Sequence, residues 1–452
     1  MHMVPPRPRQ SAIVPGEGGP LAERLLAALA PERWPVPPEE LPAGTAVVGG
    51  AVRDALLGQL APQPDLDLVV EGDAVALAKR LARRRGGSVV VLDAERSIAR
   101  LVLHGWTLDL ARRLGSRPEQ DLLRRDYSAN AIALTLPGGA GAPMLLDPAG
   151  GLADLASGQL RAVSEANLLE DPLRLLRGVR LAAERGLRIE PTTWGWIRRH
   201  HQALGRVAAE RVLSELERLA AAPAGGAGLA RVLEADLLAS WGEAASPETA
   251  LEAAVPPGGG PGDRDRLQTA RILSGLNPEA VAVRGLCPGE SAAALPLARL
   301  AVLLAPASLR RLRASRRRLE SCSRLRRWWQ RLEASGGDPE TLGEEERLQL
   351  QRDLEADLPA LVLLAPPAWA ATALARWRDP DDPLFHPRSP LDGADLQEAL
   401  GLQPGPELGR LLAHLCRERA FGRLPRDPAR HDPQTLTQAR RWLSGGSESR
   451  HG

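Results

Sequence analysis

Apolar and polar positions alternate with two different periods in the first third of the chain. The helical period fits residues 51–58, which end at Gly58, and residues 73–86, for which Asp73 is a suitable N-cap. Short apolar runs between and around these helices predict strands at TAVVGG (45–50), DLDLVV (65–70), SVVVLD (88–93), ARLVLHG (99–105) and WTLDLA (106–111). Residues 124–136 are expected to run from a helix into a further strand. This alternation predicts an α/β domain.

After Gly150 the strand patterns stop and helical periodicity dominates. A strong helix is expected over 168–186, with Pro172 in its first turn and Gly186 at its C-terminus. Segments rich in Gly and Pro at 220–228, 255–264 and 379–390 suggest boundaries. The predicted fold is an α/β head of about five mixed strands, followed by helical neck, body and tail domains. The expected bounds are a partly disordered N-terminal extension (1–40), the catalytic head (41–150), the neck (151–225), the body (226–385) and the tail (386–452).

Composition narrows the class of protein. The chain has 452 residues, 44% of them hydrophobic and 25% charged, as in ordinary globular proteins. Its 58 basic and 56 acidic side chains nearly cancel, so global charge does not identify a nucleic-acid binder. No apolar run approaches the ~18 residues of a membrane span, and no secretory signal is recognisable. The three cysteines are far apart, which excludes a disulfide framework or zinc signature and favours a reducing cytoplasm.

The sharpest chemical signal is a pair of carboxylates, Asp65 and Asp67, on a predicted strand. At positions i and i+2 both side chains project from one face, while Leu66 and Leu68 point to the other. Two carboxylates so close repel each other when ionised, and Mg²⁺, which prefers oxygen ligands, relieves that repulsion. Taken alone, the pattern is weak and is more often a solvated strand face.

The context of this pair favours phosphate chemistry. Gly49 and Gly50 lie between a strand and a helix, where backbone N–H groups can approach an anion. Arg53 follows in the first helical turns and can bind a phosphate oxygen, although a surface pair with Asp54 is the alternative. A phosphate cradle followed by a dicarboxylate suits phosphoryl or nucleotidyl transfer by two metals. Asp109, on a later strand, is either a third ligand or a structural residue at a strand end.

Several motifs then occur in the order typical of one enzyme family. The chain resembles the tRNA nucleotidyltransferases and bacterial poly(A) polymerases, that is, the class II CCA-adding enzymes among the polymerase-β-like nucleotidyltransferases. The resemblance is dense over residues 45–220 and looser over 390–445. It rests on VVGGAVRDALLG (47–58) with DLDLVVEGD (65–73), RRDYSANAIAL (124–134), DPAGGLADL (147–155), LLEDPLRLLRGVRLAAERGLRIEP (168–191), ERVLSELERL (210–219) and PLDGADLQEALGLQPGPELGRLL (390–412).

The resemblance implies roles for individual residues. Mg²⁺ would be held by Asp65 and Asp67, and the substrates would be CTP, ATP and the 3′ acceptor end of tRNA. By the same resemblance, the triphosphate would be bound by Gly49, Gly50 and Arg53. The ribose would be selected by Arg125, Asp126 and Asn130. The base would be read by Asp171 and Arg174, with Arg177 one turn further along the same helix. Without the resemblance, Asp171 would be an N-cap before Pro172. Arg211 would either assist from the fifth motif or form a salt bridge.

The chain departs from the family pattern between Asp109 and Arg124. Only LARRLGSRPEQDLL separates them, whereas long family members carry a flexible loop there. In this family a short loop accompanies enzymes that add CC and leave the terminal A to a second nucleotidyltransferase. Complete CCA addition and A addition stay open, as do poly(A) polymerase-like activity on other RNA and a non-catalytic RNA-binding role. Tyr127 and Ser128 replace the usual Phe and Thr of the second motif, which are mild changes.

Two other features invite a functional interpretation. Residues 310–331 contain ten Arg and one Glu, with Trp328 and Trp329 beside them. On a helix such a patch would follow RNA phosphates, with stacking on the Trp rings, or else would be a solvated face of an Arg-biased chain. His431 and Asp432 have no companion His or Asp cluster and are expected to be ordinary surface residues.

Overall fold

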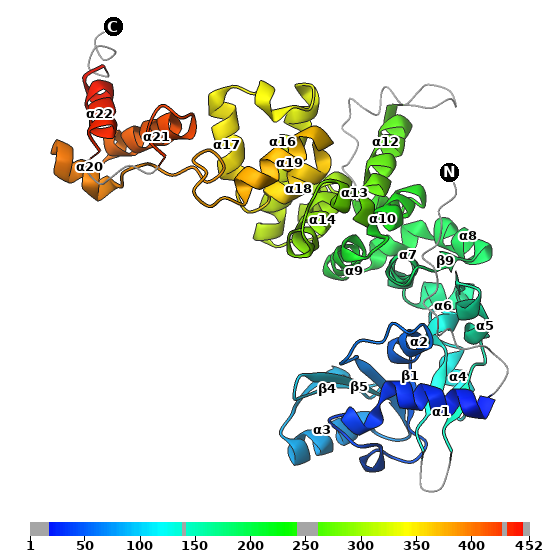
Figure 1. Ribbon diagram of the computed structural model, residues 1–452. Coiled ribbons are helices and arrows are strands. Elements are labelled where there is room, and N and C mark those ends of the chain that lie inside the picture. The colour runs from blue at the N-terminus through cyan, green and yellow to red at the C-terminus, as the bar shows by residue number, and fades with distance from the viewer. Residues whose placement is uncertain (1–17, 138–141, 242–260, 427–431, 446–452) are drawn as a thin grey trace. The chain divides into compact units, whose positions relative to one another are not determined.

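The computed structural model describes residues 18–137, 142–241, 261–426 and 432–445 (Figure 1). The chain divides into two compact units. The first comprises the chain up to Glu215 together with Glu234–Ser240, and the second comprises Leu216–Leu233 and the chain from Trp241 onward. The part of the 1–40 extension that precedes residue 18, and His431, lie outside the described residues. In the part of the chain that the structure covers, no helix is both long and apolar enough to cross a bilayer.

A mixed sheet forms the centre of the first unit, with strand order β3-β4-β5-β2-β1-β6-β7. Its central strands β2 and β5 are parallel, and every other pairing is antiparallel. The α/β class is therefore confirmed. The strands are β1 (Ala46–Val48), β2 (Leu66–Val70), β3 (Ser88–Asp93), β4 (Ile98–Leu103), β5 (Trp106–Arg112), β6 (Ala133–Thr135) and β7 (Met144–Leu146).

The sheet has seven strands rather than about five. The further strand expected within 124–136 is β6, whereas β7, only three residues long, was not predicted. The expected helix at the start of 124–136 is a 3₁₀ turn, Ser128–Asn130. A further parallel pair, β8 (Gln159–Leu160) with β9 (Arg188–Ile189), lies where the sequence indicated only helices. Two-residue strands are set by tertiary pairing and leave no pattern of their own.

Two helices pack against the sheet, one that precedes it in the sequence and one that lies between β2 and β3. Helix α3 (Ala74–Arg85) packs against β3, β4 and β5, and Asp73 caps it by accepting from the N–H of Ala76, as expected. Helix α1 (Gly18–Leu29) packs against α2 (Gly50–Leu56), β6 and β7 through buried Leu21 and Leu25. In Figure 1 α1 lies beside the sheet, so it is part of the head unit and not of a separate extension.

The strong helix expected over 168–186 is two helices, α6 (Glu165–Glu170) and α7 (Leu173–Arg185). The break falls at Asp171, which has extended backbone because it precedes Pro172. Gly186 ends α7 in the left-handed conformation, as predicted. The other helices of the first unit are α4 (Pro118–Leu122), α5 (Gly151–Ala156) and α8 (Pro191–Arg199), and α9 (Ala209–Ala221) leads into the second unit.

The second unit consists of helices and their connections, with no strand among its described residues. Its helices are α10 (Gly225–Glu234), α12 (Pro261–Gly275), α13 (Pro278–Val283), α14 (Pro288–Leu303), α15 (Pro306–Arg311), α16 (Arg316–Ala334), α17 (Glu344–Leu354), α18 (Leu358–Leu364), α19 (Pro367–Trp377), α20 (Gly393–Leu400), α21 (Pro406–Ala420) and α22 (Pro433–Gly445). The predicted break at 379–390 separates α19 from α20. The segment 255–264 was expected to be a loop throughout, but α12 already begins at Pro261.

The glycine-rich segment 220–228, which was expected to be a boundary, lies inside the second unit and is a packing site. Gly225 and Gly226 begin α10, and a Cβ at Gly226 would lie 2.1 Å from the carbonyl oxygen of Leu273. The buried guanidinium of Arg299 donates to the carbonyls of Ala220 and Ala222 at the end of α9, at 2.6 and 2.9 Å. Glycine is needed here because the backbones approach so closely.

Candidate active site

Two candidate carboxylates meet at the centre of the sheet. In the parallel pairing of β2 with β5, Asp67 lies opposite Asp109. Asp65, just before β2, is exposed, whereas Leu66 and Leu68 are buried. This alternation places Asp65 and Asp67 on the sheet face opposite the core, as the spacing predicted. Sequence alone did not show that Asp109 shares a row with Asp67.

Gly49 and Gly50 lie directly against Asp67. Gly49 has φ 73°, and a Cβ there would lie 2.7 Å from Oδ2 of Asp67. Gly50 begins α2, and its backbone N–H donates to the Asp67 carboxylate. Glycine at position 49 is therefore required by both backbone conformation and space. The backbone N–H groups at the start of α2 and the carboxylates of β2 form one site.

The electrostatics of Asp67 suit a bound cation. Burial raises the pKa of its carboxyl above the ordinary value, and neighbouring Asp109 raises it further, against the opposing effect of Arg125 and Arg177. A divalent cation bound by carboxylate oxygens would offset this cost. Among the described residues no three His, Cys, Asp or Glu side chains converge on one metal position. Asp65 and Asp67 supply carboxylate oxygens of the kind that divalent cations take as ligands.

Arg100 is a member of the site that the sequence analysis missed. It lies on β4 opposite Asp109, and its Nε and Nη2 donate to the two carboxylate oxygens of Asp109, each at 2.8 Å. This bidentate pair raises the pKa of Arg100 above its ordinary value. The available signal was one charged residue in the otherwise apolar run IARLVL, which has little weight in an Arg-rich chain.

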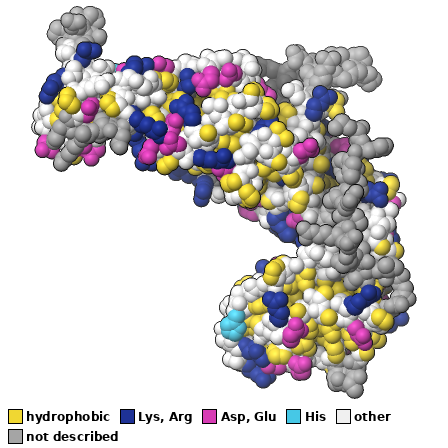
Figure 2. Space-filling view, in the orientation of Figure 1, with side chains coloured by type: hydrophobic (Ala, Val, Ile, Leu, Met, Phe, Trp, Pro, Cys, Tyr) yellow, Lys and Arg dark blue, Asp and Glu magenta, His cyan; other side chains and the backbone are white. Residues whose placement is uncertain are grey.

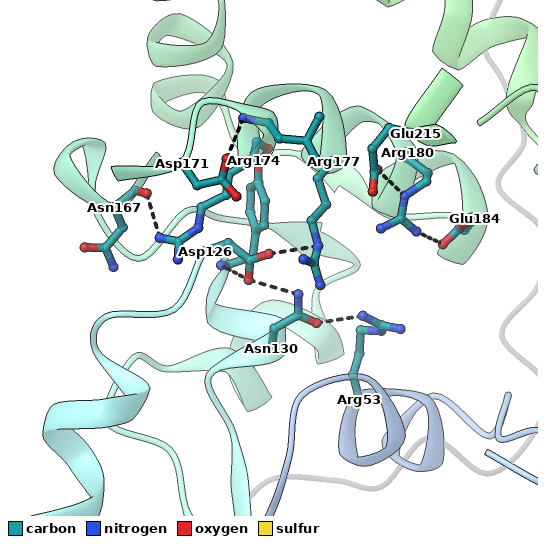
Figure 3. A network of polar contacts seen from close by, with 12 residues as sticks. Arg53, Asp126, Asn130, Asn167, Asp171, Arg174, Arg177, Arg180, Glu184 and Glu215 are labelled. Carbon is teal, nitrogen blue, oxygen red and sulfur yellow. Dashed lines mark hydrogen bonds and ion pairs between the residues drawn. The ribbon is translucent and has the colours of Figure 1, made fainter. Parts of the chain in front are cut away.

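Arg53 belongs to a buried polar chain that links the head to α7 (Figure 3). Its Nη1 donates to Oδ1 of Asn130 at 2.6 Å, and Asn130 donates through Nδ2 to Asp126 at 3.0 Å. Asp126 pairs in turn with Arg177 of α7 at 3.1 Å. Arg53 also pairs with Asp54 at 2.7 Å, as the structural alternative expected, but Arg53 is buried and not on the surface. The predicted residues Arg53, Asp126, Asn130 and Arg177 are thus brought together.

Arg125 lies at the edge of the same site. Its Nη2 is 3.4 Å from Asp121, and its buried Nε has no hydrogen-bond partner. The backbone carbonyl of Arg125 accepts from Nδ2 of Asn167 at 2.7 Å, which ties this turn to α6. A buried donor without a partner is costly and fits a group that binds an oxygen of a ligand.

Asp171 and Arg174 are close in sequence, but each is held by a different partner. Asp171 accepts from Nη2 of Arg211 on α9 at 2.8 Å. Arg174 donates through Nη1 to the carbonyl oxygen of Asn167 at 2.7 Å. Their i,i+3 spacing predicted that Asp171 and Arg174 share one face of a helix. This prediction is wrong, because Asp171 precedes the first turn of α7. Figure 3 shows the contact of Arg174 with Asn167.

The connection from β5 to α4 is short and closed on itself. Oε1 of Gln120 accepts from the N–H groups of Ser116 and Arg117 at 2.9 and 3.4 Å. Oδ1 of Asp121 accepts from the N–H of Leu114 at 3.2 Å. The turn between Arg112 and Pro118 therefore uses its polar groups internally, which fits the short loop expected from the sequence.

Five arginines of the Arg-rich segment 310–331 form ion pairs with carboxylates. It includes most of α16, where Arg331 pairs with Glu346 at 2.8 Å and Arg327 pairs with Asp353. Trp328 is buried and donates to Asp353 at 2.8 Å, so its ring is not available for stacking on a base. Basic side chains are visible over the second unit in Figure 2, but acidic ones are interspersed with them. This arrangement favours the solvated-face interpretation of α16.

Comparison with known proteins decides the family. The poly A polymerase head domain matches residues 45–114 and 109–161, and the probable RNA and SrmB-binding site of polymerase A matches residues 186–242. The CC-adding tRNA nucleotidyltransferase of Synechocystis is 32% identical over 83% of this chain and 89% of its own length. The chain belongs to the tRNA nucleotidyltransferase and poly(A) polymerase family. It is therefore a nucleotidyltransferase.

Other members of the family agree on fold and differ in the nucleotide named. A CC-adding enzyme of Thermus thermophilus is 36% identical over 83% of this chain and 90% of its own length. An A-adding enzyme of Deinococcus radiodurans is 39% identical over 44% of each chain. The fold of the CCA-adding enzyme of Bacillus stearothermophilus in complex with CTP matches with a TM-score of 0.63 and 21% identity, covering 89% of this chain and 94% of that one. The predicted family is thus confirmed.

Proposed function

We propose that this nucleotidyltransferase adds two CMP residues to the 3′ end of tRNA in the cytoplasm and leaves the terminal A to a second enzyme. The row of Asp67 and Asp109 beside the Gly49–Gly50 backbone supports nucleotidyl transfer. The closed turn between β5 and α4 supports the restriction to CC, because it leaves no long loop that could rearrange after the second addition. Two relatives that align over most of their own length, from Synechocystis and Thermus thermophilus, are named CC-adding enzymes.

Each group of residues would have a different role in the reaction. Asp65 and Asp67 would hold Mg²⁺, which when bound stabilises the charge that develops on the transferred phosphate. Gly49, Gly50 and Arg53 bind the triphosphate. The acceptor's 3′ oxygen forms a bond to the α-phosphorus of CTP while the bond from that phosphorus to the bridging oxygen breaks, releasing pyrophosphate. The hydroxyl proton leaves to solvent, and Asp109 orients the hydroxyl.

The nucleoside part of CTP would lie between the head and α7. Arg125, whose Nε lacks a partner, and the Asp126–Asn130 pair face the ribose. Asp171 and Arg174 read the base, since a carboxylate accepts from the cytosine amino group and a guanidinium donates to its ring nitrogen and carbonyl. Arg177 orients Asp126 from α7 through their 3.1 Å ion pair.

The test offers purified protein and Mg²⁺ with three tRNAs, ending at the discriminator base, at C and at CC, with CTP and ATP given separately and together. Addition of two C and no A to the discriminator end supports the proposal. Completion of CCA shows that the short turn does not limit the reaction. Addition of A to the CC end alone makes the chain the partner enzyme. No addition to any tRNA contradicts action on this substrate, and incorporation into unrelated RNA would then indicate a poly(A) polymerase-like activity.

A further inference from the structure

A single row of residues crosses four strands of the sheet from the catalytic carboxylates to the edge. Asp67 on β2 pairs with Asp109 on β5, Asp109 pairs with Arg100 on β4, and Arg100 pairs with Val90 on edge strand β3. Residues that lie directly opposite each other across strands project from the same face of a sheet. The open face that carries the carboxylates therefore continues through Arg100 to Val90.

This continuation is apolar and exposed. Val90 is 52% exposed, and Val102, which pairs with Thr107 in the next row, is 37% exposed. On the opposite face of β4, Leu101 and Leu103 are buried and the sheet packs against α3. An exposed apolar strip that continues a catalytic row indicates a binding surface, because single scattered apolar residues would not align with the site.

The order of the strands determines which substrate reaches this strip. The Gly49–Gly50 backbone follows β1, on one side of β2, whereas Asp109, Arg100 and Val90 lie on the other side. If the triphosphate lies on the Gly49–Gly50 side, pyrophosphate leaves toward β1. An in-line displacement requires the attacking hydroxyl to approach from the opposite direction, which is the β5 side. The nucleotides that precede this hydroxyl then extend over β4 and β3.

The position and exposure of the Arg100 guanidinium suit contact with a nucleobase on this path. Its guanidinium is fixed through Nε and Nη2 by both oxygens of Asp109, and its side chain is still 46% exposed. A guanidinium held in this way keeps its planar faces available, and unstacked RNA bases stack on such planes. The contact requires no change in the Arg100–Asp109 pair.

We propose that the exposed strip of Arg100, Val90 and Val102 on β4 and β3 is the acceptor subsite. The terminal base of the RNA acceptor stacks on Arg100, and the preceding nucleotide lies against Val90 and Val102. The proposal rests on the proposed function, because it assumes an RNA acceptor. It concerns where that acceptor binds and not which nucleotide is added.

The direct test is photocrosslinking of the full-length protein to a tRNA minihelix with a photoreactive base at its 3′ terminus, without any nucleotide. Mass spectrometry should place the crosslink within residues 87–103. A crosslink confined to other segments overturns the proposal. The crosslink does not depend on catalysis, so it tests the acceptor subsite even if the wild-type protein fails to add CMP. Failure to add CMP would contradict the proposed function and not the acceptor subsite.

The kinetic test uses the double variant V90E/V102E, with M144E as a matched control. Met144 is also an exposed apolar strand residue, 59% exposed, but on β7 at the other edge of the sheet. The double variant should raise the KM for the acceptor about tenfold, with the KM for CTP within about twofold, because loss of base contacts weakens RNA binding selectively. M144E should match wild type.

Three results would overturn the acceptor subsite. The first is a folded V90E/V102E variant, verified by its thermal unfolding, whose acceptor KM equals that of wild type. The second is an equal effect of M144E, which would make the defect a general one of sheet edges. The third is a wild-type dimer in sedimentation that the double variant dissociates with no change in acceptor KM, which would assign the strip to contact between copies of the chain.

Discussion

The hydroxyl of Tyr127, in the second motif, donates to the backbone carbonyl of Arg174 on α7 at 2.7 Å. Tyr127 is fully buried, and burial raises the pKa of its hydroxyl above the ordinary value, so it remains a donor. Its ring lies against Gly178, where a Cβ would be 2.0 Å from Oη and 2.6 Å from the ring carbon Cζ. Tyr127 thereby positions the helix that carries the candidate base-reading arginine.

Gly178→Ala should destabilise the first unit by about 1–3 kcal/mol, because the added methyl group overpacks a buried contact. Tyr127→Phe should cost about 1 kcal/mol, the usual net value of one hydrogen bond. The double variant should recover only part of the loss, since the ring carbon still lies within reach of the new methyl. Urea unfolding measures all three, and a Gly178→Ala protein as stable as wild type would contradict this packing.

Asp67→Asn should reduce CMP incorporation about 10³-fold or more, because bound metal supplies several kcal/mol of transition-state stabilisation. Binding of the acceptor minihelix, measured by fluorescence anisotropy, should stay within about twofold. Asp65→Ala should behave alike. Incorporation that survives either change would remove these residues as metal ligands, and loss of Mn²⁺ binding by electron paramagnetic resonance provides a readout independent of turnover.

Arg174→Ala should lower discrimination between CTP and ATP by about tenfold, since a polar group that hydrogen-bonds the correct base is left unpaired by a mismatched base. Arg211→Ala is the matched control. Arg211 binds Asp171 through a half-exposed ion pair worth at most about 1 kcal/mol, and its loss should leave discrimination within about twofold. The measurement is the ratio of kcat/KM for the two nucleotides. An equal effect of both changes would instead place base reading on Asp171 and Arg211 together.

Glu290→Gln tests the second unit through its pH dependence. Paired hydrogen bonds from Arg378 lower the pKa of Glu290 to about 2. A depressed folded-state pKa contributes stability that is complete above the unfolded value near 4.5 and is lost as pH falls toward about 2. The variant should therefore be about 1–2 kcal/mol less stable at pH 7, and the difference should shrink below pH 4.5. A difference independent of pH over this range would contradict the ion pair.

Much of the fold was predictable because local periodicity and local residue chemistry agree. The strand carrying Asp67 is framed by buried Leu66 and Leu68, and the cap at Asp73 needs only its own helix. Strand β7 and the pair of β8 with β9 escaped prediction because the existence of such short strands depends on pairing with a distant strand. The division of the helix at Pro172 was not predicted either. The sequence indicated one helix over 168–186, whereas the structure has two helices that meet at this proline.

The sequence by itself determined the family, the order of its motifs and the identity of the candidate ligands, because chemistry of this kind needs particular side chains at particular spacings. Only the tertiary structure decided which of them meet. Asp109 comes next to Asp67 through a parallel pairing of strands 42 residues apart in register, and Arg100 reaches Asp109 through the next pairing. Strand order is set by packing over the whole sheet, so no local pattern in the chain records it.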